Sequence, residues 1–221
     1  MTGKISEIFK SIQGEGVYQG KSQAFVRFFG CNLECRFCDT KLSFFQEVTL
    51  KDLLSQISSF GRCHSIALTG GEPLLQIDFL RDLVKKLKQE GRVTYLESNG
   101  TLPNNLAKII ECVDIVAMDF KLPTSTGQKS FWVEHREFLE IAKAKKVFVK
   151  AVIGKDTQIE DVKTSISIIK EKDKAIPFVL QPENPFEEEL ENKLNNFREI
   201  AQRALADVRI IPQLHKKIGI R

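Results

Sequence analysis

Short apolar runs alternate with longer amphipathic stretches along most of the chain. The short runs are rich in β-branched and aromatic residues and are bounded by glycine, proline or polar residues, which is typical of β-strands. Seven segments fit this pattern: 24–29, 65–69, 93–97, 115–119, 147–153, 177–181 and 208–211. We therefore predict strands over these seven segments.

Between the predicted strands, apolar residues recur every three or four positions, which predicts helices with one buried face. The five patterns are Leu50, Leu53, Leu54 and Ile57; Leu80, Leu83, Val84 and Leu87; Phe138, Leu139, Ile141 and Ala142; Ile159, Val162, Ile166 and Ile169; and Leu190, Leu194, Phe197, Ala201, Ala204 and Leu205. Repeated strand–helix units with right-handed crossovers favour a parallel sheet that curls toward a barrel. A complete eight-unit barrel usually needs about 250 residues. The 221 residues therefore predict an α/β fold, an incomplete TIM-type barrel of parallel strands with outer helices.

Polar and glycine-rich segments follow five of the predicted strands. They are residues 31–40, 69–73, 98–101, 121–125 and 181–184. In parallel α/β folds the carboxyl ends of the strands form the active-site face. We therefore expect these five loops to converge on one cavity.

Composition and charge narrow the class of protein. With 42% apolar residues, the chain can bury one substantial core, and we predict a single domain over residues 1–221. The 33 basic and 29 acidic residues give a net charge of +4, which favours an ordinary solvated surface over nucleic-acid binding. Apolar runs stay short of the roughly 20 residues of a membrane span, and the N-terminus lacks a signal-peptide pattern. We expect a cytoplasmic protein without a membrane partner.

The most specific chemical feature is a group of three cysteines. Cys31, Cys35 and Cys38 follow the first predicted strand with the spacing Cx3Cx2C. Three thiolates without a fourth can hold three irons of a 4Fe-4S cluster and leave the fourth iron open to another ligand. An open iron indicates catalysis rather than electron storage.

Three other interpretations of these cysteines compete with the cluster. The spacing also fits one face of a buried helix, although Gly30 and Asn32 favour a turn. A structural zinc site would need a further ligand such as histidine, and His64, His135 and His215 are distant in sequence. His64 and His135 also have surface-like neighbours. A disulfide framework is disfavoured because the chain has five cysteines, an odd number.

The cysteine triad together with the segment Gly-Gly-Glu-Pro at 70–73 resembles the radical S-adenosylmethionine (SAM) enzymes. Phe37, just before the third cysteine, agrees with the pattern of that superfamily. The resemblance implies that the open iron binds the amino and carboxylate groups of SAM. Gly71 would permit a close backbone approach, and Glu72 would accept a charge-assisted hydrogen bond from the α-ammonium.

A narrower resemblance, to the 7-carboxy-7-deazaguanine synthase family, extends over nearly the whole chain. The segments that carry it are 11–16, 25–27, 38–40, 97–100, 121–125, 180–182 and 212–216. It implies a carbon–nitrogen lyase of queuosine and 7-deazapurine biosynthesis, which contracts 6-carboxy-5,6,7,8-tetrahydropterin to 7-carboxy-7-deazaguanine with loss of ammonia. SAM would supply a 5'-deoxyadenosyl radical and be regenerated, so that the cofactor carries the difficult chemistry.

The resemblance also implies roles for individual residues. Cys31, Cys35 and Cys38 would ligate the cluster. The residues implied to contact SAM are Phe37, Asp39, Gly71, Glu72, Ser98, Asn99, Asp119, Phe120, Lys121, Gln181, Pro182, Glu183 and Asn184. Those implied to bind substrate are Ile12, Gln13, Gly14, Glu15, Arg27 and Thr69. Glu15 would accept from the guanidine-like edge of the pterin, and Arg27 would pair with its carboxylate. Thr40 would be the protein ligand of Mg2+, an ion that prefers oxygen donors.

The implied partners are a pterin substrate, an electron donor such as flavodoxin or ferredoxin, and a second copy of the chain in a homodimer. Two other functions remain open at this point: a glycyl-radical-enzyme activase, which can share the cysteine spacing, and a non-catalytic iron-sulfur or zinc protein. The roles of His215 and of Arg221 at the C-terminus also remain open.

Overall fold

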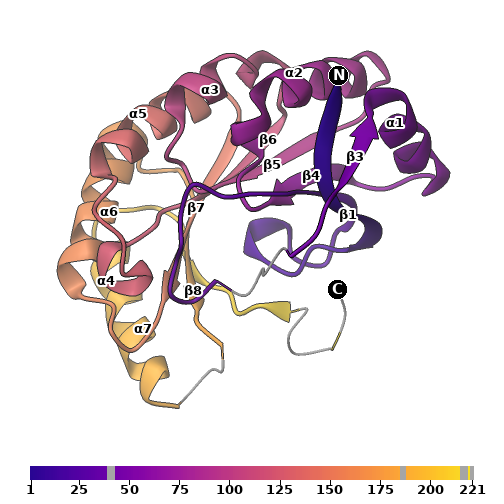
Figure 1. Ribbon diagram of the computed structural model, residues 1–221. Helices are drawn as coiled ribbons and strands as arrows, with labels where there is room; N and C mark the ends of the chain where they lie inside the picture. The colour runs from indigo at the N-terminus through magenta and orange to yellow at the C-terminus, as the bar shows by residue number, and fades with distance from the viewer. Residues whose placement is uncertain (39–42, 185–187, 215–218, 220–221) are drawn as a thin grey trace.

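A curved nine-stranded sheet forms the centre of the computed structural model, which describes residues 1–38, 43–184, 188–214 and 219 (Figure 1). The strand order within this part of the chain is β3-β1-β2-β4-β5-β6-β7-β8-β9. Pairing is parallel from β2 through β9, whereas β1 pairs antiparallel with both β2 and β3. The sheet is thus a partial barrel, as predicted.

All seven predicted strands are confirmed to within two residues. They are β2 (Ser22–Phe28), β4 (Ser65–Gly70), β5 (Thr94–Ser98), β6 (Ile115–Asp119), β7 (Lys146–Ile153), β8 (Phe178–Pro182) and β9 (Val208–Ile210). Most of their residues are buried, because a parallel sheet covered by helices places both faces away from water. Continuous apolar runs therefore marked these strands in the sequence.

Two strands were missed, β1 (Thr2–Ile12) and β3 (Gln46–Thr49). The pairing of β1 with β2 shifts register between Ile5 and Glu7. Such a bulge breaks the two-residue alternation on which strand prediction depends. Strand β3 is short and largely exposed, so it lacks an apolar run.

Helices lie along the convex side of the sheet (Figure 1). The five predicted ones are confirmed as α1 (Leu50–Ser59), α2 (Ile77–Gln89), α5 (Trp132–Ala142), α6 (Ile159–Lys172) and α7 (Glu188–Gln202). The short helices α3 (Pro103–Ala107) and α4 (Pro123–Thr126) and the 3-10 turns η1 (Gly16–Tyr18), η2 (Pro73–Gln76) and η3 (Ile110–Cys112) were not predicted. Elements of three to five residues are too short to show a helical period.

The two faces of the sheet have different surroundings. Val26, Leu68 and Leu96 belong to the large core between the sheet and the helices. The concave face carries a smaller apolar cluster of Phe25, Ala67, Tyr95, Ile115, Ala117, Phe148 and Val179. Because side chains alternate along each strand, the next concave-face residues toward the carboxyl ends are polar. The concave face thus has an apolar floor and a polar rim.

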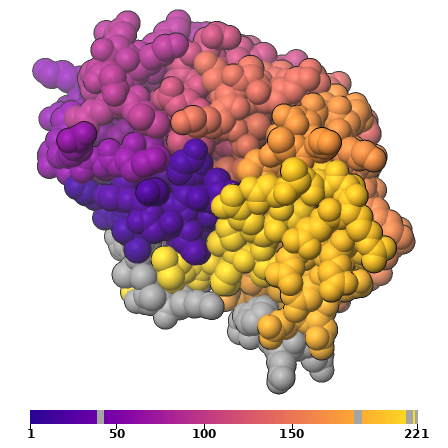
Figure 2. Space-filling view, turned by 180° about the vertical axis from the view of Figure 1, so that it is seen from behind, coloured from indigo at the N-terminus to yellow at the C-terminus, as the bar shows by residue number. Residues whose placement is uncertain are grey.

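The N-terminal and C-terminal segments meet beside the concave face. Leu214 donates its backbone N–H to the carbonyl of Gly14 at 2.8 Å, and the side chain of Gln19 donates to the carbonyl of Pro212 at 2.7 Å. Figure 2 shows the indigo N-terminal segment against the yellow C-terminal one. Among the described residues, every helix is too short or too polar to cross a membrane.

Candidate active site

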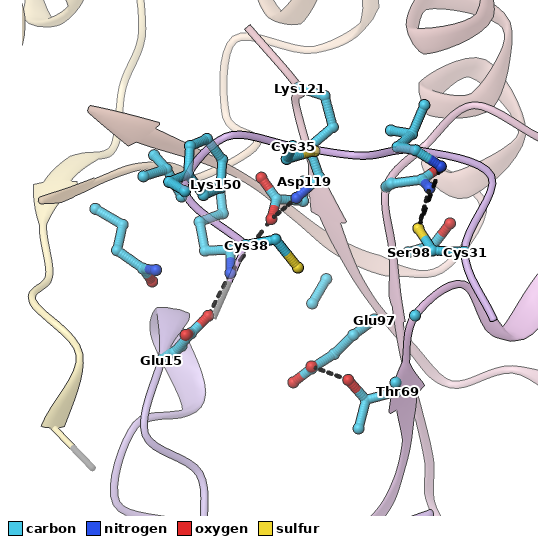
Figure 3. Close-up of a pocket in the computed structure, with 18 of the residues that line it drawn as sticks. Glu15, Cys31, Cys35, Cys38, Thr69, Glu97, Ser98, Asp119, Lys121 and Lys150 are labelled. Atoms are coloured by element: carbon cyan, nitrogen blue, oxygen red, sulfur yellow. Dashed lines mark hydrogen bonds and ion pairs between the residues drawn. The ribbon is translucent and has the colours of Figure 1, made fainter. Parts of the chain in front are cut away.

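A cavity of about 1000 Å³ opens at the carboxyl ends of the parallel strands (Figure 3). All five polar loops predicted to converge contribute to it. Their representatives in the wall include Cys31, Thr69, Ser98, Lys121 and Gln181. The convergence is therefore confirmed for the described part of each loop. It follows from the parallel topology, which brings the carboxyl ends of neighbouring strands to one edge.

The three cysteines of the triad line this cavity as free thiols. The sulfur of Cys31 accepts from the backbone N–H of Leu33 at 3.4 Å and from Asn99 Nδ2 at 3.9 Å. Cys38 N–H donates to the carbonyl of Cys35 at 3.0 Å, which turns the chain between these two ligand candidates. The triad therefore presents its sulfurs from a turn and not from a buried helix face.

Burial sets the protonation of two of these thiols. It raises the pKa of Cys31 above its ordinary value and that of Cys35 to about 11. In the chain without a metal group both are therefore neutral thiols at pH 7. Because iron binds the thiolate, ligation must release these protons. Loading of the triad is consequently favoured at higher pH.

Contacts from the end of α4, from the loop after it and from the loop after β7 hold the cysteine loop in place. Arg36 N–H donates to the carbonyl of Thr126, and Gln128 Nε2 donates to the carbonyl of Glu34, both at 2.9 Å. An exposed ion pair joins Arg36 to Asp156 at 3.1 Å. The two backbone-directed bonds fix the path of the loop more firmly than the exposed ion pair does.

The turn after β4 packs directly against the first residues of the cysteine loop. Gly71 N–H donates to the carbonyl of Phe28, and Glu72 N–H to that of Gly30. A Cβ atom on Gly71 would lie 2.0 Å from the carbonyl oxygen of Gly30. Only glycine permits this approach. The Gly-Gly-Glu turn and the cysteine loop are thus in contact through their backbones.

Glu72 is fully buried beneath the turn that follows β5. Its carboxylate accepts from Asn99 N–H at 2.8 Å, from Ser98 Oγ at 3.0 and 3.1 Å, and from Leu74 N–H at 3.1 Å. Burial raises its pKa to about 7 despite these bonds. In this arrangement Glu72 orients Ser98 and Asn99, which themselves line the cavity. Its direct contact with SAM stays a prediction.

Replacing Glu72 with glutamine is expected to remove a pH dependence of stability. The native pKa of about 7 exceeds the ordinary 4.5, so the native state binds the extra proton and its stability falls as pH rises through this window. The shift corresponds to about 3 kcal/mol. The measurement is the free energy of unfolding by urea of cluster-free, reduced protein at pH 5 and pH 8. Parallel pH profiles for the two proteins would contradict the assignment.

The pKa shift of His135 covers an overlapping pH range. Because His135 is present in both the unmodified protein and Glu72→Gln, comparing their free energies of unfolding cancels its contribution. Burial lowers its pKa to about 4. The stability contributed by the neutral imidazole is therefore fully present above the ordinary pKa of 6.5 and is lost as pH falls toward 4. His135 is fully buried, stacks on Phe120 at 4.7 Å and lies 3.1 Å from the carbonyl of Asn99. The surface location expected for His135 was wrong. The residue lies on the inward face of α5, where aromatic side chains cover it.

Four charged side chains form a row along one wall of the cavity. Asp119 Oδ2 lies 2.8 Å from Lys121 Nζ and 3.5 Å from Lys150 Nζ, and Lys150 also forms an ion pair with Glu15. Gln213 Nε2 donates to the other oxygen of Glu15 at 2.6 Å. Burial opposes ionisation of both carboxyls, but Lys150 and Gln213 hold the pKa of Glu15 below its usual value, and Lys121 and Lys150 do the same for the pKa of Asp119.

A further carboxylate, Glu97, faces the cavity and was assigned no role from the sequence. It accepts from Thr69 Oγ1 at 2.6 Å (Figure 3). Its other oxygen accepts from Gln13 Nε2 at 2.8 Å, so each oxygen is held by one donor. Gln13 uses its other N–H on buried Gln23, at 2.9 Å. The signal that could have revealed Glu97 is a carboxylate in the penultimate position of a buried strand.

The remaining predicted site residues fall into three groups. Phe37, Pro182, Glu183 and Asn184 line the cavity, and Lys121 Nζ lies 5.4 Å from the centre of the Phe37 ring. Ile12, Gly14, Arg27 and Phe120 are outside its described lining; Arg27 pairs with Glu7 at 3.4 Å and lies 5.4 Å from the ring of Phe9. Asp39, Thr40, His215 and Arg221 lie outside the described residues.

The described donor set fits an iron-sulfur cluster and a polar cofactor. Three thiols from one turn face a common cavity, and two N–H groups already point at the sulfur of Cys31. Asp119 Oδ1 and Gln181 Oε1 are buried in the wall without a hydrogen-bond partner among the described residues. Buried acceptors normally have partners. These two are suited to receive donors from a bound ligand.

Comparison with known proteins agrees with this fold. The profile described as "Radical SAM superfamily" matches residues 25–175. A 7-carboxy-7-deazaguanine synthase from Geobacter sulfurreducens is 36% identical over 98% of this chain and 97% of that protein. One from Archaeoglobus fulgidus is 37% identical over 100% of both. The crystal structure of QueE from Escherichia coli, 24% identical, shares the fold with a TM-score of 0.69 over 97% of this chain and 95% of that one.

The fold, the cysteine triad and the profile match together define a radical SAM enzyme. Membership in this class implies a 4Fe-4S cluster, SAM, a small-molecule substrate and an electron donor. Within the class, the full-length identity to the two synthases is decisive. The chain belongs to the 7-carboxy-7-deazaguanine synthase family.

Proposed function

We propose that the protein converts 6-carboxy-5,6,7,8-tetrahydropterin to 7-carboxy-7-deazaguanine and ammonia. The observation that carries this proposal is one cavity with two chemically distinct sides. The cysteine triad and the Gly-Gly-Glu turn form one side, and Glu97 with an aromatic floor forms the other. Full-length relatives that bear the synthase name support the same reaction.

On the cofactor side, Cys31, Cys35 and Cys38 would hold the cluster. A bound and reduced cluster would supply the electron for cleavage of SAM. The chain itself contributes position and shielding: the close backbone contact at Gly71 sets the distance between the cysteine loop and the turn after β4. Asp119 Oδ1 and Gln181 Oε1 offer buried acceptors for the donor groups of SAM.

On the substrate side, Tyr95, Ala117 and Phe148 give the cavity an apolar floor. The flat pyrimidinone ring of the tetrahydropterin can lie on such rings with little conformational cost. Glu97 then faces its aminopyrimidinone edge, where adjacent N–H groups match the two oxygens of a carboxylate. Thr69 and Gln13 hold those oxygens in orientation. Glu97 thereby joins Glu15 as a candidate acceptor for this edge.

The direct test is turnover by reconstituted protein under anaerobic conditions. Reduced protein is incubated with SAM and carboxytetrahydropterin, and the deazapurine and ammonia are quantified by mass spectrometry and an enzymatic assay. We expect product in excess of the SAM consumed, because the family regenerates this cofactor. Intact substrate after incubation with cluster-loaded protein would overturn the proposal, and glycyl-radical formation on an added protein would support the activase function.

Magnesium is proposed as a further cofactor, with Thr40 as its protein ligand. Mg2+ keeps several waters and substrate oxygens, so one protein oxygen suffices. Replacing Thr40 with alanine should leave the cluster intact, lower turnover and raise the Mg2+ concentration needed for half-maximal rate about tenfold, the scale of a perturbed metal site. Turnover is measured across a Mg2+ titration, with Thr40→Ser, which keeps the oxygen, as the matched control. Coincident titration curves for Thr40→Ala and the unmodified protein would refute the role.

The assembly is proposed to be a homodimer that accepts electrons from a flavodoxin or ferredoxin in the cytoplasm. Support comes only from the family resemblance. Light scattering on anaerobically purified protein measures the mass directly. A mass near the 25.1 kDa of one chain would exclude the dimer.

A further inference from the structure

Lys150 occupies the middle of the charged row and has no assigned role. It projects from β7 between Glu15 and Asp119, as Figure 3 shows. Its side chain is only 15% exposed. Asp119 and Lys150 are register partners on neighbouring parallel strands, so their side chains leave the same face of the sheet. The sheet itself therefore sets this contact.

The two carboxylates that Lys150 joins lie on either side of it in this row and belong to different proposed subsites. Glu15 belongs to the loop after β1, which is the proposed substrate side, and Asp119 ends β6 on the proposed SAM side. Lys121 and Lys150 both contact Oδ2 of Asp119, which leaves Oδ1 without a partner among the described residues. Lys150 and Gln213 each hold one oxygen of Glu15. One ammonium thus orients both carboxylates.

Charge balance makes this ammonium difficult to replace. The row contains two carboxylates and two lysines and is formally neutral. Without Lys150, Asp119 would keep only the ammonium of Lys121, and Glu15 would keep only the amide of Gln213 among the partners that the described residues supply. A buried charge that loses its partner is strongly unfavourable. Glu15 and Asp119 would then protonate or turn toward water, and both subsites would lose their orientation.

We propose that Lys150 is a positioning residue that couples the substrate side of the cavity to the SAM side. The inference rests on the proposed function for the names of the two sides, whereas the coupling itself needs only the geometry of the row. A change at Glu15 alters the position of Lys150 and, through it, the orientation of Asp119 Oδ1. Glu15 should therefore influence SAM binding without touching SAM.

The test is a double-mutant cycle read out by SAM binding. The dissociation constant of SAM is measured by anaerobic calorimetry on cluster-loaded, unreduced protein without pterin, for Lys150→Met, Glu15→Gln and the double variant. We expect Lys150→Met to weaken binding about tenfold and Glu15→Gln about threefold, in the range for residues of one charge network. The double variant should bind no more weakly than Lys150→Met alone, because without the Lys150 ammonium Glu15 no longer acts on Asp119.

Conservative and matched variants separate coupling from general damage. Lys150→Arg keeps the charge and should stay within about threefold of the unmodified protein. Lys146→Met, the same substitution at an exposed position of β7, should leave SAM binding unchanged. If Lys150→Met fails to fold, SAM binding by Glu15→Gln in the unmodified and Lys150→Arg backgrounds still tests whether Glu15 influences the SAM side. Unchanged SAM binding in Glu15→Gln, or strictly additive losses, would overturn the proposal even if the protein turns over the pterin.

Discussion

Replacing Cys35 with alanine is expected to abolish cluster assembly and all turnover. Cys35 is the central member of the triad, lines the cavity and is half-buried among the other ligand candidates. Two thiols cannot hold three irons. Iron and acid-labile sulfide analysis together with the visible spectrum of anaerobically reconstituted protein measures the loss. The fold should persist, because the loop is also held by Thr126 and Gln128.

Cys63→Ala is the matched control for this prediction. Cys63 packs against the core between sheet and helices, away from the cavity lining. Its loss should cost about 1 kcal/mol of stability and leave the cluster unchanged. A complete cluster in Cys35→Ala would remove this residue from the ligand set. About one zinc per chain with no sulfide in the unmodified protein would instead reject the radical mechanism.

The second large effect is expected for Glu97→Gln. The carboxylate is the charge-assisted acceptor proposed for the aminopyrimidinone edge, and its amide replacement turns one acceptor into a donor facing other donors. Loss of hydrogen bonds to a charged group corresponds to about 10- to 150-fold in kcat/KM for the pterin. Steady-state kinetics at saturating SAM measures this ratio. SAM affinity should be unchanged, which distinguishes a substrate contact from general damage to the cavity.

Glu90→Gln supplies the control, since Glu90 is an exposed residue at the end of α2. Its kinetics should match those of the unmodified protein. A normal kcat/KM in Glu97→Gln would show that another residue recognises the aminopyrimidinone edge of the pterin. Glu15 would then be the next candidate. Glu15 is already engaged by Lys150 and Gln213, which makes it less free to reorient toward a ligand.

The parallel strands and long helices could be predicted from the sequence because their signals are local. Continuous apolar runs marked β2 and β4 through β9, and three- and four-residue spacing marked the five long helices. The register shift in β1 removed its alternation, so that strand was missed. His135 was misplaced for a related reason: polar neighbours in sequence do not show which face of a helix turns inward.

The candidate site likewise has a part that could be predicted from the sequence and a part that could not. The cysteine triad and the Gly-Gly-Glu turn are contiguous motifs, so their chemistry could be predicted from their spacing. Lys150 is a single residue within a strand, without a motif around it, and Glu97 begins a family-like segment (97–100) that indicated no role for it. Their importance depends on partners such as Gln13 and Glu15, which come from distant parts of the chain.

The sequence by itself determined the parallel strands, the five long helices, the curled parallel sheet and the presence of an iron-sulfur chemistry, because periodicity and close spacing are properties of neighbouring residues. Only the tertiary structure decided which side chains share the cavity. It placed the carboxylate of Glu72 beneath Ser98 and Asn99, gave Glu97 its two donors and joined Glu15 to Asp119 through Lys150. Those contacts depend on strand register and sheet curvature, which bring together residues far apart in the chain.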